Sequence, residues 1–225
     1  MGRVLGSGED KVLDWSFHNH YCTTRQHDLH PDAPMPRPRE FDRDQALDGA
    51  MELFWEKGFE ATSVGDLEEA LGVGRQSLYN TFGDKRSLFL AALDRYAGMS
   101  GAMAVELESA SGGLQAIRRY FSTVVEFLTP DGPRRGCFLT RSLVDHGESD
   151  PDVTGRCDAN TGRLQAGMER ALRIAVERGE VRPDLPVEAT ARLLVTQVYG
   201  LGVLARGAAT QEELGGTVDA LLARL

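Results

Sequence analysis

Residues 61–89 read ATSVGDLEEALGVGRQSLYNTFGDKRSLF, and this stretch decides the fold. Ser63, with Asp66 three residues later, is a pair that caps the start of a helix, and apolar residues follow at helical spacing. The pattern predicts a helix of about eight residues, a glycine turn over 72–74 and a second short helix over 75–82. This is the spacing of a helix-turn-helix.

The second helix is too short to be stable alone, so it needs apolar anchors. Leu78 and Phe82, four residues apart, are expected to pack against Leu47, Leu67 and Leu71. The remaining side chains then point outward, and their amide, guanidinium and hydroxyl groups suit contacts with DNA bases and phosphates. They are Arg75, Gln76, Ser77, Tyr79, Asn80 and Thr81.

Helical periodicity continues on both sides of this unit. Asp42 or Asp44 is suited to cap a preceding helix that ends at Lys57-Gly58, where Phe59 is expected to pack back on Trp55. Asp84 is suited to cap the next helix. The later pattern shows no alternating strand and predicts an all-α fold, with helices near 117–128, 137–144, 150–179, 187–205 and 211–225.

The segments 61–64, 71–74, 77–85 and 88–89 together resemble the N-terminal domain of the TetR family of transcriptional regulators, over roughly residues 37–97. The resemblance implies a three-helix DNA-binding domain over 37–86 and a C-terminal helical domain for ligand binding and dimerisation over 87–225. Residues 1–36, with their prolines, are expected to be a disordered extension or linker, and Met35 is an alternative start.

The resemblance also implies roles for individual residues. Tyr79, Lys85 and either Thr62 or Ser63 would contact phosphates, and Thr81 stands where the family often has His. Gly74 departs from the family pattern, which usually has Ser or Thr as the cap there. The residues expected to bind DNA are Arg37 and Arg39 on the proline-rich arm, Thr62, Ser63, Arg75, Gln76, Ser77, Tyr79, Asn80, Thr81 and Lys85.

For the C-terminal domain the resemblance implies a homodimer formed through the last two helices, 187–225, and a pocket for a small-molecule effector. The helix that starts at Asp84 would transmit ligand binding to the DNA-binding domain. The expected effector is a modest apolar or aromatic compound, with His146 as a further polar contact. Candidate pocket residues are Met99, Met103, Tyr120, Phe121, Val124, Phe127, Phe138, Arg141, Met168 and Tyr199.

The net charge of −9 is unusual for a protein that binds DNA. Acids outnumber bases by eleven to seven even between Arg37 and Arg86, so DNA binding must rest on a local cluster. The sequence shows neither a secretory signal nor an apolar run long enough to span a membrane, and its three cysteines are widely spaced; together these favour a cytoplasmic protein. No nucleophile elbow, P-loop or dinucleotide motif is present, so we expect no enzyme activity, cofactor or metal.

Two alternatives remain open at this point. Cys137 lies near Arg134 and Arg135, which favour the thiolate, so Cys137 or Cys157 could sense oxidants or electrophiles. A second alternative, of another class, is a metal-binding module at the N-terminus. Its candidate ligands are His18, His20, Cys22, His27 and His30, whose spacing fits no standard zinc site.

Overall fold

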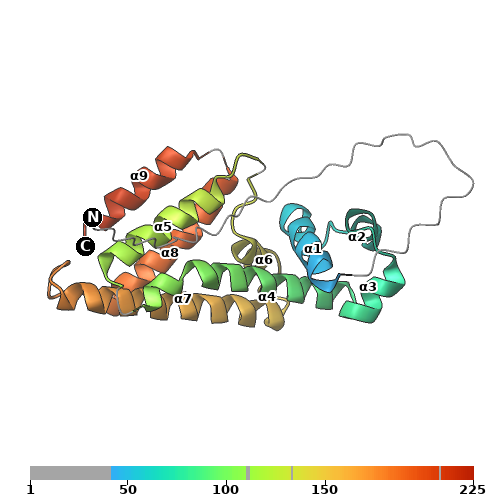
Figure 1. The fold of residues 1–225 in the computed structure, drawn as a ribbon, viewed down its shortest axis with the longest axis horizontal. Helices are drawn as coiled ribbons and strands as arrows, with labels where there is room; N and C mark the ends of the chain where they lie inside the picture. The colour runs from blue at the N-terminus through green and yellow to red at the C-terminus, as the bar shows by residue number, and fades with distance from the viewer. Residues whose placement is uncertain (1–41, 110–111, 133, 208) are drawn as a thin grey trace, which may run out of the picture. The chain divides into compact units, whose positions relative to one another are not determined.

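The computed structural model describes residues 42–109, 112–132, 134–207 and 209–225. The predicted linker over 1–36 lies outside these ranges. Within them every regular element is a helix, which confirms the all-α prediction (Figure 1). The elements are α1 Arg43–Lys57, α2 Val64–Leu71, α3 Arg75–Phe82, α4 Lys85–Met103, the 3₁₀ helix η1 Val105–Glu108, α5 Leu114–Leu128, α6 Phe138–His146, α7 Pro151–Glu177, α8 Val187–Arg206 and α9 Gln211–Leu222.

Side chains just before the helices fix where the helices begin. Asp42 caps α1 by accepting from the backbone N–H of Asp44 at 2.9 Å, so Asp42 is the cap of the two candidates. Ser63 caps α2 in the predicted reciprocal arrangement with Asp66, and Asp84 caps α4. These are local signals, and the sequence located all three helix starts correctly.

One hydrophobic cluster joins the first four helices to α6 and to the start of α7. Phe54 of α1 and Phe89 of α4 meet edge to face with ring centroids 5.3 Å apart. Phe59 packs on these two rings, whereas the ring of Trp55 meets Tyr96 and Phe127, so the expected ring contact of Phe59 is made with Phe54 and Phe89 instead of Trp55. The same cluster contains Phe138 of α6. Apolar packing therefore continues from the predicted DNA-binding segment, 37–86, into the helices that follow it.

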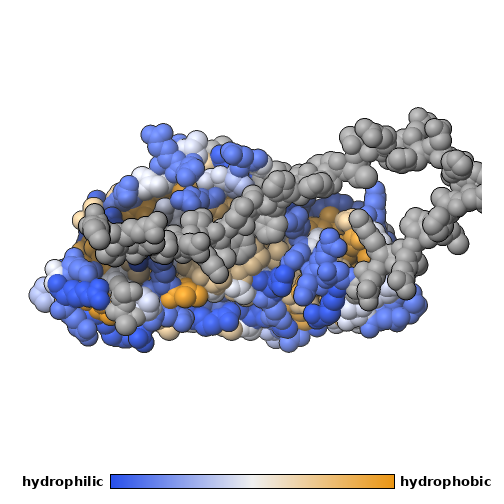
Figure 2. All heavy atoms as spheres, in the orientation of Figure 1, coloured by the Kyte–Doolittle hydropathy of each residue, from blue (hydrophilic) through white to orange (hydrophobic). Residues whose placement is uncertain are grey.

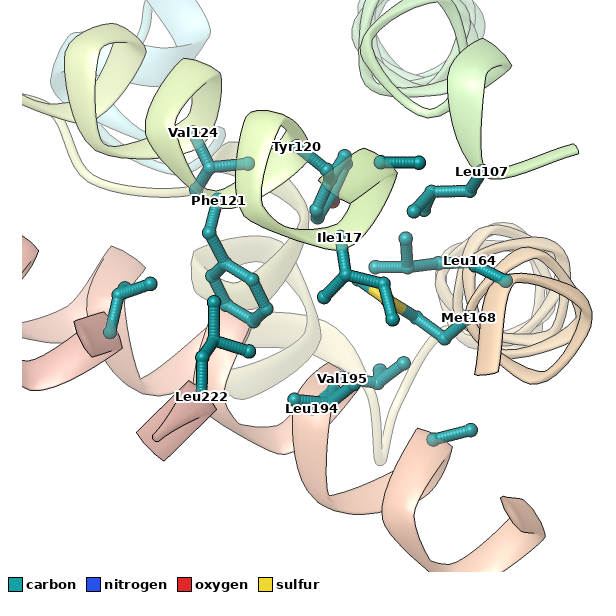
Figure 3. Packing of buried hydrophobic residues seen from close by; sticks show 14 of the residues in the cluster. Leu107, Ile117, Tyr120, Phe121, Val124, Leu164, Met168, Leu194, Val195 and Leu222 are labelled. Atoms are coloured by element: carbon teal, nitrogen blue, oxygen red, sulfur yellow. The ribbon is translucent and has the colours of Figure 1, made fainter. Parts of the chain in front are cut away.

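A second hydrophobic cluster lies among α5, α7, α8 and α9. Figure 3 shows the Phe121 ring on α5 pointing toward Leu222 of α9, with Ile117 and Met168 in the same cluster. Phe121, Ile117 and Met168 are all 0% exposed. Phe121 and Met168 therefore fill the core between helices.

Salt bridges tie distant parts of the chain together at the surface. Arg86, at the start of α4, donates to Asp150 and Asp152 at the start of α7, with N–O distances of 2.7 Å to both carboxylates. Arg95 of α4 pairs with Asp48 of α1 at 2.7 Å. Both pairs fix α4 against its neighbours.

Hydrophilic residues cover most of the face drawn in Figure 2, and hydrophobic residues show mainly between the helices. Helix α8 is an exception, because its Leu193, Val203 and Leu204 are 47%, 60% and 53% exposed. Among the described residues, no helix is both long and apolar enough to cross a membrane.

Candidate functional site

Two buried side chains hold α3 in place. Leu78 is 1% exposed, Phe82 is 9% exposed, and both share a cluster with Leu67 of α2. Gly72 ends α2 with a φ of 64°, a left-handed conformation that glycine adopts without strain. The turn therefore lets α3 pack beside α2 as the helix-turn-helix spacing predicted.

The outer face of α3 is polar. Six predicted DNA-contacting residues of this helix are exposed or half-buried: Arg75, Gln76, Ser77, Tyr79, Asn80 and Thr81. Gln76 Nε2 donates to Asn80 Oδ1 at 2.9 Å, so these two amides lie one turn apart on one face. Such a face offers both donors and acceptors to base edges in a major groove.

Lysine and arginine side chains flank α3. Lys85 Nζ lies 4.3 Å from the centroid of the Phe59 ring, and the Arg43 guanidinium lies 5.3 Å from that of Phe82. These cation–π contacts keep both charges close to the surface around α3. Within the described part of the chain, neither Arg75 nor Lys85 forms a salt bridge, so both charges are available to phosphates.

The N-terminus of α3 is capped by another helix. Gly74 has no side chain to cap with, but Glu68 of α2 accepts the backbone N–H of Arg75 at its Oε1, 2.7 Å away. This cap was not predictable from the sequence, because its signal is only an acid seven residues ahead of the helix. A carboxylate here offsets the missing side-chain cap and is favoured by the helix dipole.

Thr62 and Ser63 have different roles. Thr62 is 0% exposed and its hydroxyl donates to the carbonyl of Gly58 at 2.6 Å, so of the two residues expected at a phosphate it is the one whose hydroxyl is used within the fold. Ser63 is exposed at the start of α2 and remains a candidate for that contact. Arg37 and Arg39 lie outside the described residues.

Several acids of this region are used within the fold. Asp48 pairs with Arg95, and Asp42 and Asp84 cap helices. A hydrogen bond from Lys57, together with those from Ser63, holds the pKa of the Asp66 carboxyl well below its usual range. These carboxylates have partners in the protein, which limits their repulsion of a nucleic acid.

A small cavity of about 30 Å³ lies among α4, α5, α6, α7 and α8. That volume holds roughly one or two water molecules. Among the described residues, none that lines the cavity has a charged side chain. The lining residues are Tyr96, Ser100, Met103, Tyr120, Val124, Phe127, Leu128, Cys137, Leu139, Asn160, Leu164, Val198 and Tyr199.

Half of the predicted pocket residues line this cavity: Met103, Tyr120, Val124, Phe127 and Tyr199. Met99, Phe121, Phe138, Arg141 and Met168 lie outside its wall, and a ligand contact for them stays a prediction. Phe121, Phe138 and Met168 fill the core, and Met99 is half-buried against the first cluster. Lining residues that the sequence did not indicate include Tyr96, Ser100, Cys137 and Asn160, which reach the wall only through the packing of helices.

Hydroxyl groups give the cavity its polar character. The hydroxyl of Tyr199 hydrogen-bonds with that of Thr161. Tyr120 is 3% exposed, and burial raises the pKa of its hydroxyl well above the usual range. Burial raises the pKa of Tyr96 in the same way. All three phenols therefore stay neutral at physiological pH.

Trp55 connects α1 to the cavity wall. Its ring stacks on Phe127 with centroids 5.6 Å apart and planes 18° apart, and it meets Tyr96 edge to face at 5.1 Å. Its Nε1 donates to the carbonyl of Gly136, 3.1 Å away, immediately before Cys137. Thus a residue of α1 contacts two residues that line the cavity.

Arg141 and His146 of α6, both predicted near the ligand, face α1 and α4. Arg141 donates to the carbonyls of Trp55, Glu56 and Lys57 at 2.9 Å each, where α1 ends. His146 packs edge to face against Phe59 and Phe89. Both residues join α6 to α1, α4 and the residues between α1 and α2.

No group of three or more potential metal ligands occurs among the residues that the structure describes. The N-terminal candidates His18, His20, Cys22, His27 and His30 lie outside those residues, so that alternative stays a prediction.

Comparison with known families accounts for both parts of the chain. Residues 46–92 match the family described as bacterial regulatory proteins, tetR family. Residues 113–221 match the family described as tetracyclin repressor-like, C-terminal domain. The first match contains α2 and α3, and the second contains most of the cavity wall.

Individual relatives cover most of the chain. It is 33% identical over 193 residues to the HTH-type transcriptional regulator YezE of Bacillus subtilis (strain 168), spanning 85% of this chain and 100% of the relative. It is 33% identical over 183 residues to the HTH-type transcriptional repressor ComR of Escherichia coli (strain K12), spanning 79% and 86%. A cysteine mutant of the regulator CifR, solved with 26bp double-strand operator DNA, has a TM-score of 0.73 and 31% identity over 84% of this chain and 98% of that one.

Proposed function

The chain belongs to the TetR family of DNA-binding transcriptional regulators, which is not a family of enzymes, and on this premise we propose that it is a homodimeric repressor released from a palindromic operator by a small molecule. In this proposal residues 37–86 bind DNA, and residues 87–225 bind the effector and form the dimer. The repressor sense is supported by relatives such as ComR, which is named a repressor.

The polar face of α3 is the observation that carries the DNA-binding part. Arg75, Gln76, Ser77 and Asn80 are exposed on a helix whose opposite side is anchored by Leu78 and Phe82. In the proposed complex these four side chains read base edges. Tyr79, Thr81, Lys85 and Ser63 contact the phosphates on either side. The CifR complex with operator DNA supports this mode of binding.

The dimer would form through α8 and α9. Leu193, Val203 and Leu204 expose apolar area on α8, which monomeric soluble proteins seldom leave uncovered when it is contiguous. Leu221 and Leu225, in and just after α9, are only half-buried. A two-fold arrangement of these helices buries this surface and presents two α3 helices to successive major grooves about 34–36 Å apart.

Contacts of Trp55 support a route from the cavity to the DNA-binding helices. An effector must favour one conformation over another to change DNA affinity. Any movement of Tyr96 or Phe127 in the cavity wall changes the packing of Trp55 on α1. Tyr96 also lies on α4, the helix that follows α3 directly and was expected to transmit the signal.

The DNA-binding proposal is tested by gel shifts over a range of salt concentrations, using the DNA that flanks the coding region. Tyr79→Phe and Lys85→Ala should weaken binding, and Lys85→Ala should reduce the salt dependence by about one phosphate contact. Arg118→Ala, which removes one positive charge from an exposed position on α5, is the matched control and should bind DNA like the wild type. Equal binding by all three variants would overturn the proposed phosphate roles.

A specific observation favours Cys137 as the basis of a second candidate function, thiol sensing. Cys137 lines the cavity, is half-buried, and caps α6 by accepting the backbone N–H of Thr140 at 3.5 Å, so its thiol lies where a molecule entering the cavity can reach it. Cys157 suits the role poorly, because burial raises the pKa of its thiol to about 11. Release from DNA by N-ethylmaleimide in Cys157→Ser but not in Cys137→Ser would support this function. Equal release of both variants would exclude it.

A further inference from the structure

Tyr120 presents an unused hydroxyl to the cavity. The residue is 3% exposed and lines the cavity wall, yet its hydroxyl has no hydrogen-bond partner among the described residues. The neighbouring phenol of Tyr199, by contrast, is paired with Thr161. A hydroxyl without a protein partner is normally hydrogen-bonded to water or to a ligand, and that of Tyr120 belongs to a residue of the cavity wall. Tyr120 therefore has the capacity to bind one polar group placed inside the cavity.

The lining of the cavity selects against charge. Its polar groups are the hydroxyls of tyrosines and Ser100, the Cys137 thiol and the amide of Asn160, and among the described residues no lysine, arginine, aspartate or glutamate lines it. A carboxylate or ammonium group entering this site would lose its water without gaining an ionic partner, which is strongly unfavourable. The chemistry fits an uncharged molecule.

The size of the cavity shows that a ring-sized molecule must displace part of the wall. The volume is about 30 Å³, whereas a cavity that binds benzene has roughly 150 Å³. Phe127 is half-buried, whereas Tyr96 and Tyr120 are buried, so among these three rings Phe127 is the freest to move. Its ring stacks on Trp55 of α1.

We propose that the cavity is the contracted form of a site for an uncharged, ring-sized molecule that carries one hydrogen-bonding group. The hydroxyl of Tyr120 binds that group, and Phe127 moves aside to admit the ring. This movement breaks the stacking of Phe127 on Trp55, so ligand binding directly changes the packing of a residue of α1. This inference rests on the proposed effector role of the cavity, and it names the chemical class of the ligand and the residues that select it.

The test uses the full chain with Trp15→Phe, which leaves Trp55 as its single tryptophan. Three probes share an aromatic ring: benzyl alcohol is neutral and polar, toluene lacks a hydrogen-bonding group, and benzoate is charged. Affinity is measured by isothermal titration calorimetry and the state of Trp55 by its fluorescence emission. We expect benzyl alcohol to bind at least tenfold more tightly than benzoate and to change the emission saturably.

Two variants separate the roles of the wall residues. Tyr120→Phe, which keeps the ring, should lower the affinity for benzyl alcohol about tenfold and leave the affinity for toluene unchanged. Phe127→Ala should bind both neutral probes more tightly, because the room already exists, and should give a smaller change in Trp55 emission on binding. Thermal unfolding of each variant establishes that it is folded before it is titrated.

The proposal would be overturned if benzyl alcohol bound neither the wild type nor Phe127→Ala, or if the wild type bound benzoate as tightly as benzyl alcohol. It would also be overturned if Tyr120→Phe lost the same affinity for toluene as for benzyl alcohol. Binding without a change in Trp55 emission would overturn the part played by Phe127. DNA is absent from this experiment. A protein that binds its operator but none of these probes would therefore keep the proposed DNA-binding role and lose this inference.

Discussion

Arg141 donates from its guanidinium to the backbone carbonyl of Trp55 at 2.9 Å, across 86 residues of sequence. The same guanidinium reaches the carbonyls of Glu56 and Lys57, so the last turn of α1 is capped by a side chain of α6. Its Nε also lies 3.4 Å from Asp145, one turn along α6. The end of α1 is thus fixed to the helix that contributes Leu139, with its cap Cys137, to the cavity wall.

Arg141→Ala should lower the free energy of unfolding by about 2 kcal/mol, because hydrogen bonds from a charged group to three carbonyls, that of Trp55 part-buried, are lost. Arg141→Lys should recover only part of this, since an ammonium group cannot span the three carbonyls. Urea denaturation measures both. Arg173→Ala, which removes only an exposed pair with Glu169 one turn away, should change stability by less than about 0.5 kcal/mol. Equal losses in Arg141→Ala and Arg173→Ala would contradict the capping role.

Glu68→Gln should increase affinity for DNA several-fold at low salt. The amide oxygen can still accept the N–H of Arg75, so the cap is retained, but a negative charge beside the proposed groove-reading helix is removed. Fluorescence anisotropy with labelled operator DNA measures the effect, which should shrink as salt rises. Glu177→Gln, an exposed charge change near the end of α7, serves as the control. If both variants bind equally, Glu68 lies too far from the phosphates to matter.

Asp150→Ala should destabilise the fold by about 1 kcal/mol or more at pH 7, because Asp150 caps α7 and pairs with Arg86. Asp152→Ala, which loses only the exposed pairing with Arg86, should cost less. Thermal unfolding of the two variants compares the stability lost with the helix cap with the stability lost with the surface salt bridge. A larger loss in Asp152→Ala would reverse this assignment.

The contribution of Asp150 should also depend on pH. Hydrogen bonds from Arg86 hold the pKa of the Asp150 carboxyl below its unfolded value of about 3.9. The folded state therefore binds its proton less readily, and the stabilisation is present above that value and lost as pH falls through the lower folded pKa. The stability difference between wild type and Asp150→Ala, followed by urea denaturation, should shrink below about pH 4. A constant difference down to pH 2 would contradict the pairing.

Leu204→Asp should convert the proposed dimer to a monomer, because it places a charge in the apolar surface of α8. Sedimentation equilibrium measures the mass. Val144→Asp is the matched control, since Val144 is 80% exposed on α6 and outside the proposed interface. If Val144→Asp alone dissociates the protein, the interface lies on α6 and the assignment to α8 and α9 is wrong.

Features set by short-range chemistry were predictable from the sequence. The helix start at Ser63 needs only Asp66 three residues away, and the anchoring of α3 follows from the spacing of Leu78 and Phe82. The family resemblance offered Thr62 and Ser63 as alternatives, and no local pattern separates these two neighbouring hydroxyls. In the fold, the hydroxyl of Thr62 reaches back to the carbonyl of Gly58.

The cavity was only partly predictable, because its wall depends on how five helices pack. Tyr120 and Phe121 are adjacent on α5 and both apolar in pattern, yet one lines the cavity and the other fills the core. A turn of about 100° between neighbouring residues separates them, and only the positions of α7, α8 and α9 decide which side is filled. Arg141 was placed in the pocket because no local pattern indicates a partner 86 residues away.

The hydrogen bond from Arg75 to Glu68 uses the backbone of residue 75 and leaves its side chain out. Any amino acid except proline supplies the same N–H, so the start of α3 keeps its geometry whichever side chain stands there. New operator sequences can therefore be acquired by exchanging residues 75, 76 and 77 one at a time on an unchanged scaffold. Randomised libraries at these three positions should yield folded proteins at high frequency, and selection among them becomes a choice between specificities.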